Sequence, residues 1–337
     1  MEHQDPPHNS NGEGAPRRFR FPWRLVIGLL AIGALAFVAR DQFGELGRLL
    51  EVKPQYLALM VILFLLARLA NAEVLVQTLR TMGHHIARKE ALMISFLRSY
   101  AGMFIPRAGA GAAGIYLKTK HGVRYADFAA LLLPIALVQC VATGGLGLGC
   151  LAILSLQYGQ GSHPVIAGVF AFSIIAGALA LLIRVAVPDD WTGRLAHFAR
   201  RLSRAWAQLS SSKSLLGRLL SLHLLAMLLR AVRLQVVFWS MGVPVSFVGV
   251  LVASLVADLS FLVSFTPNAL GIREAAIVFG ARAAGATAAE ALAAAILDRL
   301  VTTVTVIVAA QISLWRMAAS KSQKPSNEQP QEAAQES

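Results

Sequence analysis

Charged residues are scarce in this sequence, at 15% of positions, whereas apolar residues make up 56%. Because a soluble domain carries more charge on its surface, this composition excludes an ordinary soluble globular protein. Cysteine is scarcer still. Cys140 and Cys150 lie in one apolar segment, at a spacing that suits neither a metal site nor a bridge within one helix, so we interpret both as packing residues.

Common catalytic motifs are also missing. The sequence has no Walker phosphate loop, no His-Glu-x-x-His pair and no Gly-x-Ser-x-Gly elbow. We therefore expect a protein that is not an enzyme, has no cofactor and binds no metal, the adjacent His84 and His85 included. A membrane-embedded lipid-modifying enzyme stays open as an alternative, because such a site can be built from scattered Arg, Asp and His residues.

Long apolar runs dominate the chain and predict membrane spans. Six runs are long enough to cross roughly 30 Å of hydrocarbon: Trp23–Ala39, Pro54–Ala72, Phe128–Leu156, Pro164–Val187, Leu215–Met241 and Ala288–Leu314. We interpret the first run as an uncleaved signal anchor, although small alanines near its end raise the question of cleavage. Residues 1–22 form a basic tail and residues 319–337 a polar tail, both expected to be disordered.

Positive charge predicts the orientation of these spans. The net charge of +13 would suggest nucleic acid as the partner of a soluble protein, but most Lys and Arg fall in short segments between apolar runs. That distribution places the basic segments and both termini in the cytoplasm, with anionic lipid headgroups rather than nucleic acid as their contacts.

Two interrupted apolar segments must then enter and leave the membrane on one side. Ala91–Leu117 contains Pro106, Gly109 and Gly111, and Val245–Ala284 contains Pro267 and Gly271. We predict a re-entrant hairpin or a pair of short helices at each segment, with opposite orientations, because freed backbone in lipid must be satisfied inside the protein.

The two hairpins also resemble each other. When Pro106 is aligned with Pro267, Phe104 matches Phe265, and Gly122 to Asp127 runs parallel to Gly285 to Glu290. A related pair with opposite orientations predicts an inverted repeat, with halves at 23–156 and 164–315, as in many transporters. The alternative is chance recurrence of Pro and Gly in alanine-rich sequence.

Residues of both hairpins resemble the lysylphosphatidylglycerol synthase transmembrane family of flippase-like proteins. The second hairpin resembles its carboxy-terminal motif through Pro267, Gly271, Ile272, Arg273, Glu274, Gly285, Glu290, Ala291 and Arg299. The first hairpin resembles its amino-terminal motif through Phe104, Ile105, Pro106, Tyr116, Leu117, Lys118, Gly122 and Val123. The resemblance covers Trp23 to Ala318 and implies a multi-pass protein of the bacterial inner membrane that moves lipids, or lipid-linked intermediates, between leaflets.

The sequence departs from the family pattern in two ways. Family members often carry an acid and an arginine shortly after the first Pro-Gly segment, where this chain reads Ala110 to Gly114. The departure implies a lost headgroup contact and a different lipid. Nothing in the sequence resembles the soluble synthetase domain of two-part members, so the resemblance implies a stand-alone translocation unit.

Arg273 is the leading candidate for binding a lipid phosphate. The planar guanidinium matches phosphate oxygens, and Arg273 follows a helix break where a new helix N-terminus also favours an anion. The alternative is an ion pair with Glu274 or another buried acid that closes the break. Arg107, at the first hairpin, is a second candidate for contacting a phosphate of the cytoplasmic leaflet.

Asp298 and Arg299 lie roughly ten residues into the last run, about 15 Å deep. Adjacent positions diverge by about 100° around a helix, so they are not expected to pair with each other. We expect Arg299 to pair with Glu274 or Asp258, and a structural pair is as plausible as a functional one.

Three arginines lie in earlier spans. Arg230 and Arg233 share one helical face and either line a headgroup path or snorkel to the outer interface. Arg68 is expected at an interface.

The sequence thus predicts an all-α polytopic membrane protein with about six full spans and two opposed re-entrant hairpins. We expect it to move an anionic phospholipid or a polyprenyl-phosphate-linked envelope intermediate. Partner proteins of envelope biosynthesis or a homo-oligomer are further expectations, as is the alternative of an assembly subunit that transports nothing.

Overall fold

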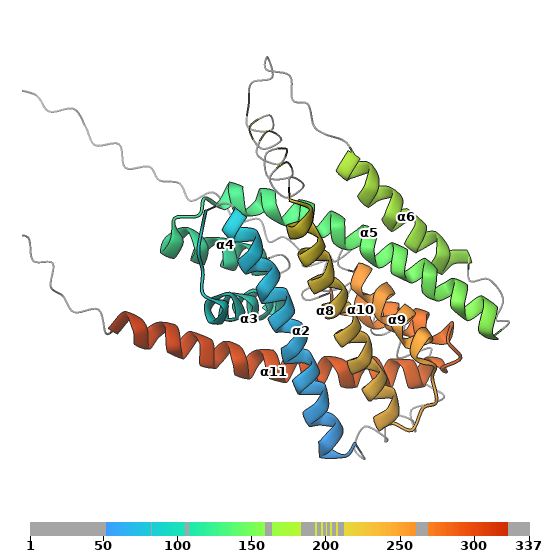
Figure 1. The fold of residues 1–337 in the computed structure, drawn as a ribbon. Helices are drawn as coiled ribbons and strands as arrows, with labels where there is room; N and C mark the ends of the chain where they lie inside the picture. Colours follow the sequence, from blue (N-terminus) through green and yellow to red (C-terminus); the bar gives the residue numbers. More distant parts are fainter. Residues whose placement is uncertain are drawn as a thin grey trace, which may run out of the picture.

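The computed structural model describes residues 52–81, 83–104, 108–158, 164–182, 212–260 and 269–322, together with five isolated positions between 193 and 207. Within these ranges the regular structure is helical, and Figure 1 shows the arrangement of the helices. The predicted span Trp23–Ala39, the residues Pro106, Arg107 and Pro267, the end of the predicted span at Val187, and both predicted tails apart from residues 319–322 lie outside the described residues.

Nine helices carry labels in this part of the chain. They are α2 (Pro54–Thr81), α3 (Arg88–Phe104), α4 (Ala108–His121), α5 (Tyr125–Tyr158), α6 (Pro164–Leu182), α8 (Lys213–Ser240), α9 (Phe247–Leu259), α10 (Ile272–Arg282) and α11 (Ala288–Ser322). The stretches Pro54–Thr81, Ile135–Leu156, Lys213–Ser240 and Ala288–Arg316 are long and apolar enough to cross a membrane. Pro164–Leu179 and Phe247–Leu259 are shorter apolar helices.

Local signals in the sequence end and begin these helices. Gly122 adopts a φ of 66° after α4, and Gly285 adopts a φ of 94° after α10. Both values lie in the left-handed region that favours glycine at the end of a helix. Before α11, the Thr287 hydroxyl accepts a hydrogen bond from the Glu290 N–H at 3.2 Å, while the Glu290 carboxylate accepts one from the Thr287 N–H at 2.9 Å. This reciprocal pair is a capping box.

The packing joins helices from both halves of the chain. α2 packs on α8, α3 on α4 and α11, and α9 on α10 and α5. In Figure 1, α11 crosses α2 and α8 at a steep angle. The predicted interrupted segments are thus present as the helix pairs α3–α4 and α9–α10, each followed by a left-handed glycine and a long helix.

Small residues bring helices close together. An added Cβ at Gly144 of α5 would lie 2.6 Å from the backbone oxygen of Phe170 on α6, and one at Gly280 of α10 would lie 2.5 Å from the Ala253 Cα of α9. Such close approach is typical of helix packing in membranes, where van der Waals contact replaces a hydrophobic driving force. Cys140 and Cys150 are buried and unbridged, in agreement with a packing role.

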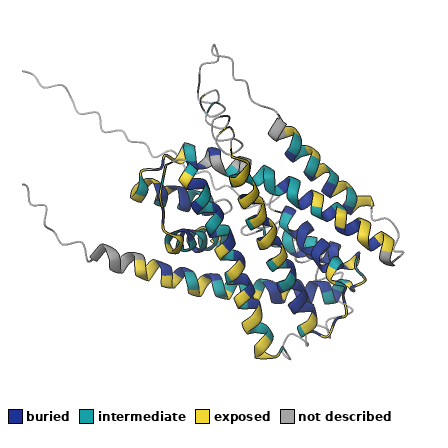
Figure 2. Cartoon of the chain, in the orientation of Figure 1, coloured by how far each residue is buried: buried dark blue, intermediate teal, exposed yellow. Residues whose placement is uncertain are grey.

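Burial is uneven across the helices (Figure 2). Most of α9 is buried, whereas α6 exposes large apolar side chains, among them Phe172 and Ile175. An exposed apolar face on an apolar helix is suited to contact with lipid tails. Helices α9 and α10 carry Asp258, Arg273 and Glu274, three of the charged residues described next.

Candidate functional site

Asp298 of α11 is the centre of a buried group of charges. Its Oδ1 lies 3.0 Å from Arg233 Nη2 of α8, and its Oδ2 accepts a hydrogen bond of 2.9 Å from Arg273 Nη2 of α10. The Asp298 side chain is 1% exposed and the Arg233 side chain 4%, whereas the Arg273 side chain is 26% exposed. One carboxylate therefore joins a fully buried arginine to a more accessible one.

Glu274, in the first turn of α10, makes two contacts. Its Oε2 accepts a hydrogen bond of 2.7 Å from the Gly271 N–H, and its Oε1 forms an ion pair with Arg299 Nε of α11. Gly271 has a φ of 79°, so the predicted helix break at this residue is a left-handed helix start that Glu274 caps. The predicted pairing of Arg299 with Glu274 is confirmed, and Asp298 and Arg299 bind different partners as expected.

Asp258 of α9 pairs with Arg230 rather than with Arg299. Its Oδ2 accepts hydrogen bonds from Arg230 Nη2 at 2.8 Å and Nε at 3.1 Å. Arg230 and Arg233, predicted to share a face of α8, therefore bind acids on two different helices, α9 and α11. The alternative that both arginines snorkel to the outer interface is wrong for Arg233, which is almost fully buried.

Arg68 was expected at an interface, but it lies in the middle of α2 beside these charges. Its Cζ sits 4.9 Å from the centre of the Phe64 ring, and the Cζ of Arg233 sits 5.4 Å from the same ring. The sequence shows an arginine in an otherwise apolar run, a pattern that does not say whether the side chain reaches an interface or points inward.

We call these eight residues the charged cluster: Arg68, Arg230, Arg233, Asp258, Arg273, Glu274, Asp298 and Arg299. The cluster contains five arginines and three acids, so its formal charge is positive. Arg230 and Asp298 each lie ten residues from one end of their long helix, a depth of about 15 Å along its axis. Charge at such a depth in a membrane helix is costly and commonly functional.

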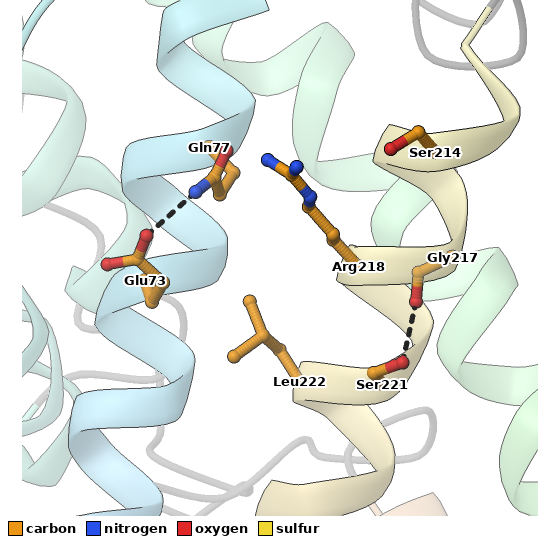
Figure 3. Close-up of a pocket in the computed structure, with 7 residues that line it drawn as sticks. All are labelled: Glu73, Gln77, Ser214, Gly217, Arg218, Ser221 and Leu222. Carbon is orange, nitrogen blue, oxygen red and sulfur yellow. Dashed lines mark hydrogen bonds between the residues drawn. The ribbon is translucent and has the colours of Figure 1, made fainter.

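A separate cleft opens between α2 and α8, nearer their other ends (Figure 3). It has a volume of about 540 Å³ and is lined by Glu73, Gln77, Ser214, Gly217, Arg218, Ser221 and Leu222. Glu73 accepts hydrogen bonds from Gln77 at 2.7 Å and from Arg88 at 2.7 Å. The cleft therefore presents the carboxylate of Glu73 from α2, and the guanidinium of Arg218 and two serine hydroxyls from α8. Sequence analysis did not predict it.

The remaining predicted site residues lie at the first helix pair. Gly109 and Gly111 fall inside the first turn of α4, which begins at Ala108, so they do not break a helix themselves. Gly109 instead permits close packing, because an added Cβ would lie 2.2 Å from the Arg98 backbone oxygen. The predicted contributions of Arg107, Pro106 and Pro267 lie outside the described residues.

Polar contacts tie α3 to α4 away from their junction. Oε1 of Glu90 accepts a hydrogen bond from the Tyr116 hydroxyl at 2.8 Å and lies 2.8 Å from both Lys120 Nζ and His121 Nε2. Burial by itself raises the pKa of the Glu90 carboxyl, but the hydrogen bonds from Lys120, His121 and Tyr116 outweigh it and lower the pKa to about 2. Glu90 is therefore ionised at neutral pH and fixes the ends of the pair.

Comparison with known proteins tests the predicted family. Neither the curated proteins nor the solved structures contain a match to this chain. The model of the lysylphosphatidylglycerol synthase TM region matches residues 23–310. This range includes all eight residues of the charged cluster and both helix pairs. The chain therefore belongs to the lysylphosphatidylglycerol synthase transmembrane family, as its hairpin motifs predicted.

Proposed function

We propose that this protein moves an anionic phospholipid, or a polyprenyl-phosphate-linked envelope intermediate, between the leaflets of a bacterial inner membrane, without modifying it chemically. The observation that carries the proposal is the charged cluster, in which five arginines and three acids meet between apolar helices. The chain belongs to a family of transmembrane domains, so the charged cluster lies in a membrane protein.

The physical requirement is replacement of lost hydration. A phosphate that enters hydrocarbon loses its water shell, at a cost of at least several kcal/mol for a buried ion, and needs donors that compensate for this loss. Guanidinium groups meet this need, because each can donate two parallel hydrogen bonds to phosphate oxygens. A positively charged cluster between apolar helices therefore offers hydrogen-bond donors at a depth where water is not available to hydrate a phosphate.

Arg273 is the residue that we assign to the arriving headgroup. It is the most exposed of the arginines that form ion pairs in the cluster, and it contacts Asp298 through Nη2. We infer that a phosphate takes the place of this contact, while Asp298 keeps its contact with Arg233. Glu274 and Asp298 would orient or neutralise cationic groups of the headgroup.

We propose an inverted repeat of six spans and two opposed hairpins, and the packing of the described helices supports the repeat. If the halves are exchanged, α3 takes the place of α9 and α5 takes the place of α11. The contact of α9 with α5 then maps onto the contact of α3 with α11, and that of α8 with α9 maps onto that of α2 with α3. Such repeats suit alternating access, since one half can rock against the other around a central site. We place both termini in the cytoplasm by the positive-inside rule.

Reconstitution tests the proposal. Purified protein in vesicles that contain a fluorescent phosphatidylglycerol should accelerate its exchange between leaflets, measured by quenching of the outer leaflet. The Arg273→Gln variant should slow the exchange about tenfold or more, the effect of losing a hydrogen bond to a charged group. Arg282→Gln is the matched control, because Arg282 lies on the same helix and is exposed.

Three outcomes would contradict the proposal. Equal exchange by the wild type and Arg273→Gln would remove the assigned role of Arg273. A change in lipid mass after incubation would identify a lipid-modifying enzyme. No exchange of phosphatidylglycerol or a polyprenyl phosphate, together with co-purifying envelope proteins, would identify an assembly subunit.

A further inference from the structure

The Phe64 ring of α2 has two cationic side chains near it, Arg68 of α2 and Arg233 of α8. Arg68 Cζ is 4.9 Å from the ring centre, and Arg233 Cζ is 5.4 Å from it. Phe64 itself is 6% exposed, so this contact is inside the protein. The negative face of an aromatic ring attracts a cation, yet one ring offers far less than a full counter-charge to two guanidinium groups.

Arg233 has unused donors, and Arg68 lacks an acidic partner in the described part of the chain. In the described part of the chain, Nε and Nη1 of Arg233 are buried without a hydrogen-bond acceptor, and its single ion pair runs through Nη2 to Asp298. Arg68 forms no ion pair with an acid within the described ranges, and a second cation, Arg233, contacts the same Phe64 ring. Buried donors without acceptors are costly, as are like charges at short range.

An anion with several oxygen acceptors would satisfy both needs. A carboxylate of the protein, that of Asp298, contacts Arg233 only through Nη2, which leaves the N–H donors of Nε and Nη1 available. A tetrahedral phosphate can accept from one of these donors and from Arg68 at the same time, because its oxygens point in different directions.

We propose that Arg68 and Arg233 form a phosphate-binding subsite beside Phe64. The group that binds is a phosphate monoester or diester, in a lipid headgroup or as free phosphate, and its lipid source rests on the proposed function. Arg273 would meet the headgroup first, and the Arg68–Arg233 subsite would hold the phosphate more deeply, with Asp298 keeping Arg233 in place. Sequence analysis assigned neither this pairing nor any binding role to Arg68.

Ligand-dependent thermal unfolding in a neutral detergent tests the subsite. The three probes are inorganic phosphate, dihexanoyl phosphatidylglycerol and dihexanoylglycerol, which lacks the phosphate. The wild type should be stabilised by phosphatidylglycerol but not by dihexanoylglycerol. A matching response to inorganic phosphate would show that the site also accepts free phosphate, and its absence would show that the lipid headgroup is required.

The variants separate binding from folding. Arg68→Gln should raise the half-saturating concentration of phosphatidylglycerol about tenfold or more. Arg68→Lys keeps the charge but loses the planar pair of donors, so its half-saturating concentration should lie between those of the wild type and Arg68→Gln. Arg282→Gln should match the wild type and controls for net charge. If Arg68 has only a structural role, Arg68→Gln should lower the melting temperature measured without ligand and leave the half-saturating concentration of phosphatidylglycerol unchanged. That result would overturn the proposal. So would a wild type that responds equally to dihexanoylglycerol.

The same variants distinguish the failure of this subsite from failure of transport. If the wild type exchanges lipids between leaflets and Arg68→Gln binds and exchanges equally well, the subsite is wrong while the proposed function stands. If phosphatidylglycerol binding depends on Arg68 but the wild type exchanges no lipid, the subsite stands and the transport function fails.

Discussion

Arg233 and Asp298 join α8 to α11 through an ion pair that is almost completely buried. Their Nη2 and Oδ1 atoms lie 3.0 Å apart, and the side chains are 4% and 1% exposed. Asp298 also binds Arg273, so a single carboxylate balances two guanidinium groups. Loss of that carboxylate would leave two neighbouring cations inside the protein with no shared acceptor.

Asp298→Asn should therefore be strongly destabilising. Removing one partner from a buried ion pair costs about 3–5 kcal/mol, because the remaining charge stays buried. Thermal or denaturant unfolding in detergent measures this loss. Asp127→Asn provides the matched control, since Asp127 pairs with an arginine whose side chain is 71% exposed, where ion pairs contribute little. Equal destabilisation by the two variants would contradict the importance of burial.

Two substitutions of Glu274 should separate its two contacts. Glu274→Gln keeps an oxygen that can accept from the Gly271 N–H but removes the charge that balances Arg299, whereas Glu274→Ala removes both. We expect Glu274→Ala to lose about 1 kcal/mol more than Glu274→Gln, the usual net contribution of one hydrogen bond. Equal unfolding free energies would show that the cap at the start of α10 contributes nothing measurable.

Neighbouring glycines of α5 should respond in opposite ways to alanine. A Cβ at Gly144 would lie 2.6 Å from the Phe170 backbone oxygen, whereas a Cβ at Gly145 would meet no atom within 4 Å. Gly144→Ala should destabilise the protein by about 1–3 kcal/mol through overpacking. Gly145→Ala should be neutral or slightly stabilising, because alanine favours the helix. A comparison of melting temperatures decides, and similar values would mean that α5 and α6 do not pack closely at Gly144.

The long helices were predictable because their signal is a long apolar run. The predicted spans from Pro54 and Ala288 begin where α2 and α11 begin. The start of α10 was also predictable, because Gly271 and Glu274 mark a helix start by local chemistry alone. The pairing of Arg299 with Glu274 followed, since a buried arginine needs an acid and Glu274 was one of two candidates.

Contacts between distant helices could not be predicted in the same way. Periodicity assigns Arg230 and Arg233 to one face of α8, but it does not say that α9 meets one arginine and α11 the other. Arg68 shows the same limit, because a single arginine in an apolar run has the same pattern whether it snorkels or points inward. The packing of α2 on α8 decides between these cases, and it also creates the cleft lined by Glu73 and Arg218.

The base of the α3–α4 pair should lose stability in acid through Glu90. The pKa of this carboxyl is about 2 in the folded protein, below its ordinary value of 4.5. A group whose pKa is lowered by folding stabilises the protein above its unfolded pKa, and this contribution falls as the pH drops toward the folded pKa. We therefore expect a full contribution above about pH 5 and a progressive loss from pH 4.5 to pH 2.

The Glu90→Gln variant isolates this effect from the titration of other carboxyls. The difference in melting temperature between the wild type and Glu90→Gln should be constant from pH 7 to about pH 5 and should shrink as the pH falls toward the folded pKa of about 2, below which both proteins carry a neutral side chain. Measurements in a neutral detergent avoid titration of lipid headgroups. A difference that stays constant down to pH 2 would mean that Glu90 stabilises the pair through its neutral shape, and that its contacts with Lys120 and His121 carry no ionic contribution.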